Sequence, residues 1–335
     1  MSTSNPNSRP SRIRSSRARS RRQKIREAVI EFGLMCCGLL SIVITIAIVT
    51  VVLIGTVDFF QDHEYDQLAA EAETHGEKPP RERVSVSYFF TGNEWTPRFS
   101  NARYGILPLI AGTLVVAVVA ALVALPIGLI TAIYLSESAT PRVRRFAKPT
   151  LEVLAGIPTV VYGYFALTTI TPFLAWFIPG LSTPQNQLGG GIVVGIMIIP
   201  LVASLSEDAI RAVPRSLREA SYALGANSFE TATRVVVPAA FSGIMASFVL
   251  AISRAIGETM IVTLACGGQP RLTLDPREGI ATMTSAIVNI AQGDVVHGST
   301  DFNSLFAVAA VLFFMTFMMN VFAQWMLGRY RQVYQ

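Results

Sequence analysis

The chain has 335 residues, of which 51% are hydrophobic and only 15% are charged, and its mean hydropathy is +0.48. Soluble domains usually carry about a quarter of their residues as charges, so this composition excludes an ordinary soluble enzyme and indicates a polytopic membrane protein. With only three cysteines, a disulfide-built secreted module is excluded as well. The net charge of +5 does not indicate nucleic-acid binding, because much of it lies in the first 26 residues, where no aromatic residues interleave the arginines.

The apolar runs predict an all-α membrane protein with six transmembrane helices. A helix needs about 20 apolar residues to cross a bilayer, and lipid permits only helices or closed barrels. The first run is longer than the apolar region of a signal peptide and no cleavage site follows it, so we expect it to remain as an anchor. The six helices are expected at 29–57, 104–135, 150–178, 190–213, 235–266 and 302–328.

The remaining segments are expected to be a disordered basic tail (1–28), two outer segments (58–103 and 267–301) and a cytoplasmic loop (214–234). Within the first outer segment, residues 58–82 are expected to form a helix or linker, and the alternation in 84–90 predicts a short strand. The glycines at 189–191 are expected to belong to the turn between helices three and four.

Lysine and arginine positions set the expected orientation. With both termini in the cytoplasm, the inner segments hold 19 of these residues and the outer segments hold 7. Such a bias towards the cytoplasmic side is typical of multi-pass proteins of a bacterial inner membrane. The tail is best explained as a topology signal with some attraction to anionic membrane lipid.

The cytoplasmic loop between helices four and five contains a short helix held between two corners. Pro214 breaks the helix that leaves the membrane, and Gly225 to Ser228 ends the next one. Between them, one face of the short helix is expected to carry Leu217, Ala220, Ser221 and Leu224. An element of this kind can lie in a groove of a cytoplasmic partner and transmit a displacement.

The same loop resembles the EAA loop of ABC-importer permeases. Glu219, Ala220 and Ser221 are followed by Gly225 and then by an apolar ending at Pro238, with the spacing of that motif. The serine stands where the motif has a second alanine. The resemblance implies a coupling helix that docks on an ATP-binding subunit, carried by Glu219, Ala220, Ser221, Leu224, Gly225 and Pro238.

Two opposite charges interrupt the fifth apolar run, Arg254 and Glu258. Their i,i+4 spacing puts both on one helix face. A structural ion pair is one interpretation. An anion pathway is the other, because ionisable residues inside membranes usually face a bundle interior or an aqueous path and a guanidinium suits phosphate oxygens. Thr159 and Thr259 could also bind a phosphate oxygen, although threonines more often bond back to their own helix.

The stretch from Arg254 to Thr259 resembles the Arg-Ala-x-Gly-Glu-Thr segment of the permeases of the bacterial high-affinity phosphate importer. Further motifs of that family are similar to 89–97, 154–163 and 282–287, so that the resemblance covers about residues 85–328. The Trp-containing motif and the long N-terminal part favour the PstC-type subunit. The resemblance implies a type I ABC importer permease with the MetI-like fold and makes Arg254 and Glu258 the candidates for the translocation route.

The resemblance also implies the partners: a second permease of PstA type, two ATP-binding subunits of PstB type and a periplasmic phosphate-binding protein of PstS type. No Gly-x-x-x-x-Gly-Lys-Ser/Thr phosphate loop occurs in the sequence, so ATP and Mg are expected in the partner subunits. The chain itself is expected to be no enzyme, to hold no cofactor, and to bind no metal through its scattered histidines. Two alternatives remain open: an importer of another oxyanion, sulfate or molybdate, and a membrane signalling subunit that reports phosphate supply.

Overall fold

The computed structural model describes residues 21–75, 81–97, 99, 101–181 and 183–330. Its contacts divide the chain into two units, residues 1–51 and 52–335. In the described part of the chain the regular structure is helical, with one isolated antiparallel bridge between Trp95 and Tyr104. The predicted all-α architecture is confirmed.

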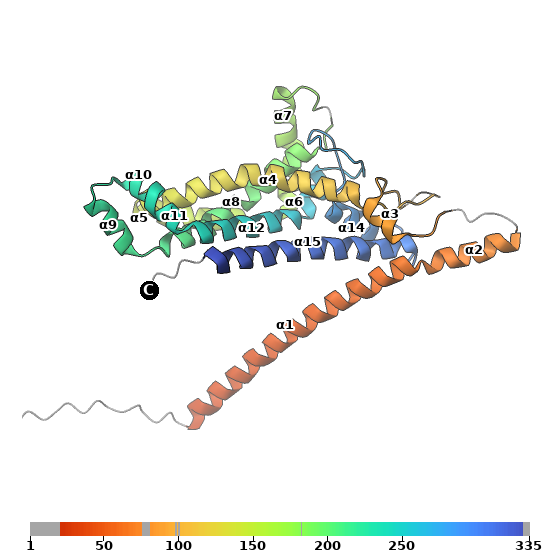
Figure 1. Ribbon diagram of the computed structural model, residues 1–335, viewed down its shortest axis with the longest axis horizontal. Coiled ribbons are helices and arrows are strands. Elements are labelled where there is room, and N and C mark those ends of the chain that lie inside the picture. Colours follow the sequence, from red (N-terminus) through yellow and green to blue (C-terminus); the bar gives the residue numbers. More distant parts are fainter. Residues whose placement is uncertain (1–20, 76–80, 98, 100, 182, 331–335) are drawn as a thin grey trace, which may run out of the picture. The chain divides into compact units, whose positions relative to one another are not determined.

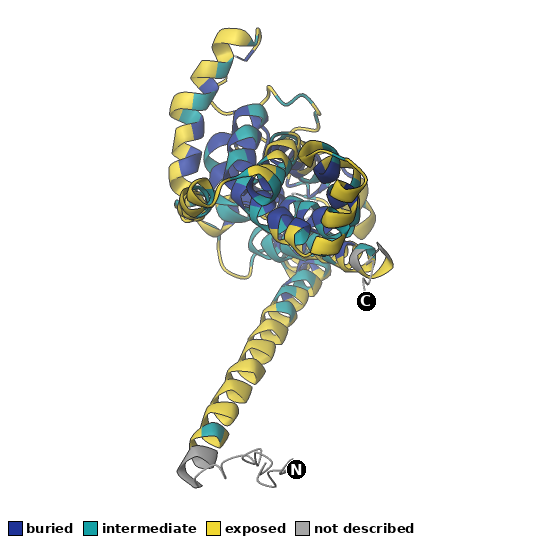
Figure 2. Cartoon of the chain, turned by 90° about the vertical axis from the view of Figure 1, so that its left-hand side faces the viewer, coloured by how far each residue is buried: buried dark blue, intermediate teal, exposed yellow. Residues whose placement is uncertain are grey.

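The first unit contributes most of a single long helix, α1 (Arg21–Gln61). With 41 residues at 1.5 Å each, α1 is about 62 Å long, roughly twice the thickness of a bilayer's hydrocarbon core. Between Val29 and Val51 its apolar side chains are exposed on every side (Figure 2), whereas Phe59 near its end is buried. Three hydroxyls of α1 bond back to the helix: Thr45 to the Ser41 carbonyl, Thr50 to the Ile46 carbonyl and Thr56 to the Val52 carbonyl. A helix that is apolar all round, with its polar groups satisfied internally, is typical of a membrane span.

The sequence predicts a disordered tail at residues 1–28, of which positions 1–20 lie outside the described residues. For positions 21–28 the prediction is wrong, because α1 already begins at Arg21. The sequence from Arg21 to Ala28 consists mainly of residues with good helix propensity. The apolar helix therefore extends into the charged segment instead of stopping at its edge.

The second unit is built on a bundle of α4 (Leu107–Ile133), α8 (Gln187–Arg211), α12 (Phe241–Ile256) and α15 (Thr300–Tyr330). These helices lie side by side, and α12 contacts the other three (Figure 1). Small residues bring α4 and α8 together: a Cβ at Gly195 would lie 2.9 Å from the Ala120 carbonyl, and one at Gly128 would lie 2.6 Å from Val202. Close backbone approach of this kind is how helices associate in membranes.

Shorter helices connect and cover the bundle. They are α2 (His63–His75), α3 (Val86–Thr91), α5 (Pro141–Ala155), α6 (Thr159–Phe165), α7 (Thr171–Phe177), α9 (Arg215–Ala223), α10 (Ser228–Thr231), α11 (Val237–Ala239), α13 (Met260–Ala265) and α14 (Met283–Ala291), with π-helical turns η1 (Tyr134–Ser138), η2 (Ala166–Ile170) and η3 (Ala232–Val236). Figure 1 shows α9 and α10 at one end of the bundle, hereafter the α9 end, and α3 and α14 at the other, hereafter the α14 end.

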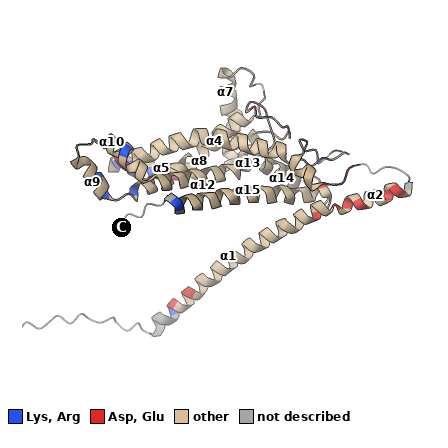
Figure 3. Ribbon diagram, viewed as in Figure 1, with Lys and Arg blue, Asp and Glu red and all other residues tan. Residues whose placement is uncertain are grey.

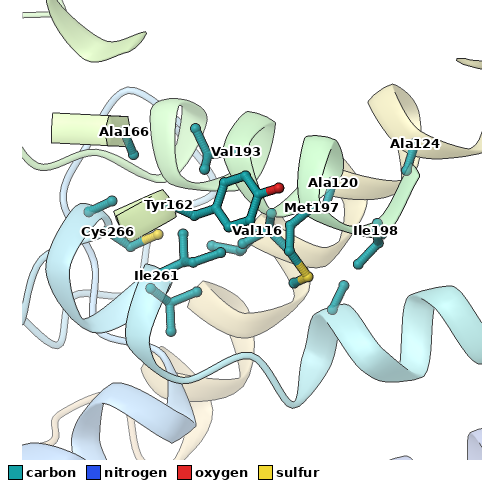
Figure 4. Close-up of a cluster of buried hydrophobic side chains, with 14 of the residues drawn as sticks. Val116, Ala120, Ala124, Tyr162, Ala166, Val193, Met197, Ile198, Ile261 and Cys266 are labelled. Atoms are coloured by element: carbon teal, nitrogen blue, oxygen red, sulfur yellow. The ribbon is translucent and has the colours of Figure 1, made fainter. Parts of the chain in front are cut away.

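The main apolar core joins α4, α6, α8, α12 and α13. Figure 4 shows the ring of Tyr162 among side chains of α8 and α4, including Val193, Met197 and Val116. The Tyr162 hydroxyl donates to the Leu154 carbonyl at 2.9 Å, which satisfies the polar end of an otherwise buried ring. This core fixes α6 and α13 against the bundle, so the elements that flank the membrane charges are held firmly.

Five helical stretches of the described residues are long and apolar enough to cross a membrane, and a bent pair brings the total to six if it is one span. The five are Arg26–Thr74, Leu107–Ser138, Thr159–Phe177, Gln187–Arg211 and Thr300–Met326, and the bent pair is Ser228–Ala239 with Phe241–Ile256. Two features predicted for these spans differ from the structure. The span predicted at 150–178 begins only at Thr159, because 156–158 interrupts the helix, and the glycines at 189–191 lie inside α8, where they allow close packing, and not in a turn.

The strand predicted for 84–90 is wrong, because residues 86–91 form the helix α3. The segment 84–90 is so short that its alternation does not distinguish a strand from a short helix. Phe89 of α3 packs with Phe59 and Tyr104 in a second core that includes residues of α14 and α15. The outer segment thus gains its core from the membrane helices and not from a sheet of its own.

A buried ion pair ties the end of α1 to the outer segment. Asp62 has a positive φ of 51°, which aspartate tolerates better than most residues, and its carboxylate accepts two hydrogen bonds from Arg81, at 2.9 and 2.7 Å. The Val84 N–H and the Thr300 hydroxyl donate to the same carboxylate. One carboxylate therefore joins α1, the segment before α3 and the start of α15.

We expect the substitution Asp62→Ala to lower the free energy of unfolding by about 3 kcal/mol, because it removes the hydrogen-bonded counter-charge of the buried Arg81 and leaves only the more distant Glu64, at 3.8 Å. Thermal unfolding of the purified protein measures this. The control is Asp66→Ala, since Asp66 pairs with Arg83 at 3.6 Å on the exposed surface, where such a pair contributes about 0–1 kcal/mol. Equal shifts for the two variants would show that the Asp62 pair does not hold the outer segment.

Candidate functional site

The fifth predicted span, 235–266, is not one continuous helix. A bend of 71° separates Ser228–Ala239 from Phe241–Ile256, and a second break unwinds residues 257–259 between α12 and α13. Irregular backbone at membrane depth is tolerated only where protein buries it or where it lines a cavity. The second break therefore marks a place where the bundle has a reason to interrupt a helix.

The two membrane charges meet at this second break. Arg254, in the last turn of α12, donates to a carboxylate oxygen of Glu258 at 2.9 Å. The carboxylate is sealed, with a side chain that is 2% exposed, whereas the arginine side chain is 46% exposed. The buried carboxylate lowers the cost of a guanidinium at this depth, and the guanidinium keeps donors that an external anion can reach.

The two threonines predicted to lie beside this pair differ in their position relative to it. Thr259 follows Glu258 directly, and its hydroxyl lies 3.4 Å from the Gly257 carbonyl. Thr159 is the first residue of α6, and within the described residues no hydrogen bond joins it to Arg254 or Glu258. Thr284 of α14 was not predicted as a partner, yet its hydroxyl donates to the Glu258 carbonyl at 2.7 Å. That bond satisfies one of the carbonyls that the helix break releases.

Arg254 borders a cavity of about 350 Å³ between α5, α8 and α12. Most of the lining is apolar, and the charged members are Arg254, Lys148, Glu152 and Glu207. The cavity includes Pro200 of α8, whose missing N–H removes one helix hydrogen bond. Charged groups beside an apolar lining interact more strongly than in water, so the two cations favour a small anion in this cavity and the two carboxylates oppose it.

At the α9 end, the short helix predicted between Pro214 and Gly225 is present as α9 and ends in a Schellman motif, while its coupling role stays a prediction. Gly225 has a φ of +88°, its N–H donates to the Tyr222 carbonyl at 3.0 Å, and the Ala226 N–H donates to the Ser221 carbonyl at 3.2 Å. No other atom lies within 4 Å of a Cβ built at Gly225. A glycine is thus required there by the backbone conformation and not by crowding.

The next helix starts with a capping box, in which Asn227 and Glu230 exchange hydrogen bonds at 2.9 and 3.0 Å. The buried hydroxyls of Ser221 and Thr231 also bond to each other at 2.9 Å. Together these contacts fix the corner between α9 and α10. The sequence pointed to Ser221, but it did not reveal Thr231, because ten residues separate the two partners.

The outer face of this corner is exposed and partly apolar. Leu224 is 90% exposed, so its predicted position on the same face as Leu217 and Ser221 is wrong, because the chain leaves the helix at Leu224. Glu219, Ala220, Gly225 and Pro238 are exposed as well. Two further exposed aromatic residues, Tyr222 and Phe229, extend the surface. Apolar side chains held out on a fixed corner are typical of a docking site for another protein.

Arg218 fastens α9 to the membrane helices. Its guanidinium donates to the carbonyl of Ile210, in the last turn of α8, at 2.9 Å. It also donates to the carbonyl of Val213, just beyond that helix, at 2.6 Å. It also donates to both carboxylate oxygens of Glu137 in η1, which continues α4, at 2.9 and 3.3 Å. One side chain therefore satisfies the open carbonyls of α8 and joins them to α4, so α9 cannot move without these helices.

A second cavity, of about 820 Å³, opens near the α14 end. Arg271 and Arg277 line it, together with Asp275. Three hydrogen bonds from the Arg277 side chain, with one from its backbone N–H, lower the pKa of the Asp275 carboxyl to about 2. Glu278 also lines the cavity, so its two arginines are balanced by two carboxylates, and Arg271 forms no ion pair with any described residue.

A family of transport proteins shares these features. The model of the family described as the binding-protein-dependent transport system inner membrane component matches residues 124–332. The chain belongs to this family of multi-pass permeases. The match includes the bent fifth span, the membrane charge pair and the α9 corner.

Individual relatives show which transport proteins the chain is similar to. The chain is 38% identical over 246 residues to a probable ABC transporter permease protein, YqgH, of Bacillus subtilis, covering 73% of this chain and 79% of that protein. It is 34% identical over 259 residues to the phosphate transport system permease protein PstC of Mesorhizobium japonicum, covering 72% and 78% of the two chains. A solved structure, a bacterial ABC transporter involved in the import of the polysaccharide alginate, matches 92% of this chain and all of its own with a TM-score of 0.58 at 14% identity, which shows a shared fold.

We expect Arg218→Gln to loosen α9 from the bundle, because hydrogen bonds to a charged group contribute about 1.5–3 kcal/mol and several are lost. Amide hydrogen exchange of α9 should become at least about tenfold faster. Arg215→Gln is the matched control, since Arg215 is an exposed arginine on the same helix. Unchanged exchange in Arg218→Gln would contradict the role given to this side chain.

Proposed function

We propose that the chain is a membrane-spanning permease subunit of an ATP-driven importer of inorganic phosphate. The observation that carries the proposal is the Arg254–Glu258 pair, in which an accessible cation and a sealed counter-charge meet at a helix break beside a cavity. A membrane protein that only anchors other subunits has no need of such a costly arrangement. The membrane-transport family of the chain supports a translocation role for it.

Phosphate is the substrate that the relatives favour. Proteins named as the PstC permease of phosphate transport systems match over about three quarters of this chain. The planar fork of a guanidinium fits a tetrahedral oxyanion, and the chemistry of Arg254 is compatible with this class of substrate. The pair alone does not separate phosphate from sulfate or molybdate, so the proposal of phosphate rests on the relatives, and uptake measurements test it.

The α9 end is proposed to face the cytoplasm. Lysine and arginine gather at that end, on α5, α9 and η3, whereas acidic residues gather on α2 (Figure 3). The bias is that of multi-pass membrane proteins, whose inner loops are positively charged. In this orientation both termini lie inside, and the cavity near Arg271 opens to the outside, where a phosphate-loaded binding protein would dock.

ATP-binding subunits are proposed to dock on the exposed corner formed by Leu224, Tyr222 and Phe229. A shift of that corner would reach α4 and α8 through Arg218 and would change access to the Arg254 cavity, giving alternating access driven by ATP. A second permease of PstA type would close the other side of the pathway. The hydrolysis of ATP would belong to the partner subunits and not to this chain.

The substitution Arg254→Gln should lower the maximal rate of phosphate uptake at least tenfold, because it removes the cation that the anion meets within the membrane. Uptake of radiolabelled phosphate in cells without other phosphate transporters measures the effect. Arg254→Lys should retain part of the rate, since it keeps the charge and loses the planar fork.

Arg142→Gln is the control for this measurement, because Arg142 is exposed on α5 and does not line the Arg254 cavity. Membrane levels of each variant must be compared in parallel. Full uptake by Arg254→Gln at normal protein levels would exclude Arg254 from the route. If the wild-type assembly took up sulfate or molybdate and not phosphate, the proposed substrate would be wrong.

Leu224→Asp tests the docking corner without altering the Schellman motif, because the side chain is 90% exposed. We expect the ATP-binding subunit to co-purify at less than a tenth of the wild-type amount. The matched control is Leu274→Asp, an exposed leucine near the α14 end, which should leave co-purification unchanged. Normal co-purification with Leu224→Asp would place the docking surface elsewhere.

A further inference from the structure

The cavity beside Arg254 contains a second cation that the proposed route has not yet used. Lys148 of α5 borders the same space, and its side chain is 37% exposed. Its ammonium nitrogen lies 3.6 Å from Glu207 and 3.8 Å from Asp208, which is beyond hydrogen-bond distance. No hydrogen bond to another described residue uses any of its three N–H donors. Lys148 is therefore a partly accessible cation with donors to offer.

The packing of α8 against α12 gives the separation, along the bundle axis, between the backbone levels of Arg254 and Lys148. The hydroxyls of Ser206 and Ser247 bond at 2.7 Å, so these two residues lie at the same level. Arg254 is seven residues beyond Ser247, about 10 Å further along α12 at 1.5 Å per residue. Lys148 lies at the level of Glu207, next to Ser206. The two cations therefore enter the same cavity from different levels of the bundle, Arg254 further from the α9 end and Lys148 nearer to it.

Glu207 makes the Lys148 end of the cavity a weak site. Its carboxylate is 1% exposed and faces three cations: it is hydrogen-bonded to Arg144, and Lys148 and Arg211 lie within 3.9 Å. Arg144 is engaged by Glu207, whereas Lys148 is only attracted by it. A site on a transport route must bind an ion well enough to receive it and weakly enough to release it. A neighbouring fixed carboxylate provides this balance.

We propose that Lys148 forms a second, inner binding site for inorganic phosphate, which the ion reaches after Arg254 and leaves towards the α9 end, with Glu207 as the carboxylate that competes for it. This inference rests on the proposed function. The chemistry recognised is a phosphate group, and two sources could supply it: the free ion in the cavity, or the headgroup of an anionic lipid beside α5. The cavity that links Lys148 to Arg254 favours the free ion.

The test measures how phosphate protects a thiol placed in the same cavity as Lys148. Ser204→Cys, which lines the cavity and leaves Lys148 in place, is introduced with Cys36→Ala and Cys37→Ala, because those two cysteines are exposed and Cys266 is buried. The full assembly is reconstituted in vesicles and labelled with a cationic methanethiosulfonate. We expect inorganic phosphate to slow the labelling of the Ser204→Cys variant at least threefold, and adding Lys148→Gln should abolish this protection. The control, Arg142→Cys on the exposed face of α5, should be labelled at the same rate with and without phosphate.

Transport gives a second measurement that a purely structural lysine would not affect in the same way. Lys148→Gln should lower the maximal phosphate uptake rate at least fivefold, and Lys148→Arg should retain it. Attachment of the cationic reagent to the thiol of the Lys148→Cys variant should restore uptake, whereas a neutral methyl reagent should not. Adding Glu207→Gln to Ser204→Cys should remove the carboxylate that competes for Lys148 and let phosphate protect the thiol at a several-fold lower concentration.

Three results would overturn the inner site. Labelling of the Ser204→Cys variant that ignores phosphate but changes between anionic and neutral lipid vesicles would assign Lys148 to a lipid headgroup. Normal uptake by Lys148→Gln, with Arg254→Gln inactive, would remove the inner site and leave the proposed function intact. Absence of phosphate uptake by the wild-type assembly would reject the proposed function, and the inner site with it.

Discussion

A guanidinium inside a bilayer is costly, and a counter-charge supplied by the protein lowers that cost at the centre of this molecule. Glu258 supplies it to Arg254 across one helical turn, directly before the point where the fifth span is interrupted at 257–259. Thr284 of α14 then satisfies a carbonyl that the break releases. The charge pair, the broken helix and the contact with α14 are thus parts of one solution to the cost of a buried cation.

The rest of the second unit connects this centre to a surface where a partner can act. The glycine contacts between α4 and α8 make the two helices a stiff pair, and Arg218 joins their ends to α9. The Schellman motif at Gly225 and the capping box that follows hold the docking corner in one conformation. A load applied to an exposed residue such as Leu224 therefore has a short, rigid path to the walls of the Arg254 cavity.

The sequence predicted the elements whose signal is local and could not predict those that depend on distant partners. Apolar runs identified the spans, and the EAA spacing located α9 with its glycine stop. The same runs could not show that 257–259 unwinds, since the reason lies in Thr284 and in a cavity made by three helices. The alternation in 84–90 was misleading, because so short a segment cannot separate a strand from a helix that packs against Phe59. Lys148 entered the sequence argument only as one of many positive charges, because its place opposite Glu207 arises from the packing of α5 on α8.

The most direct test of the central claim is a density map of the complete assembly, determined with phosphate present and the ATP-binding subunits trapped in their closed state. The account predicts that Arg254 faces a water-filled space between this chain and the second permease, with Glu258 behind it and anion density within hydrogen-bond distance of the guanidinium. Contradiction would come from an Arg254 side chain directed into the acyl chains, or packed against protein with no aqueous connection to either side of the membrane.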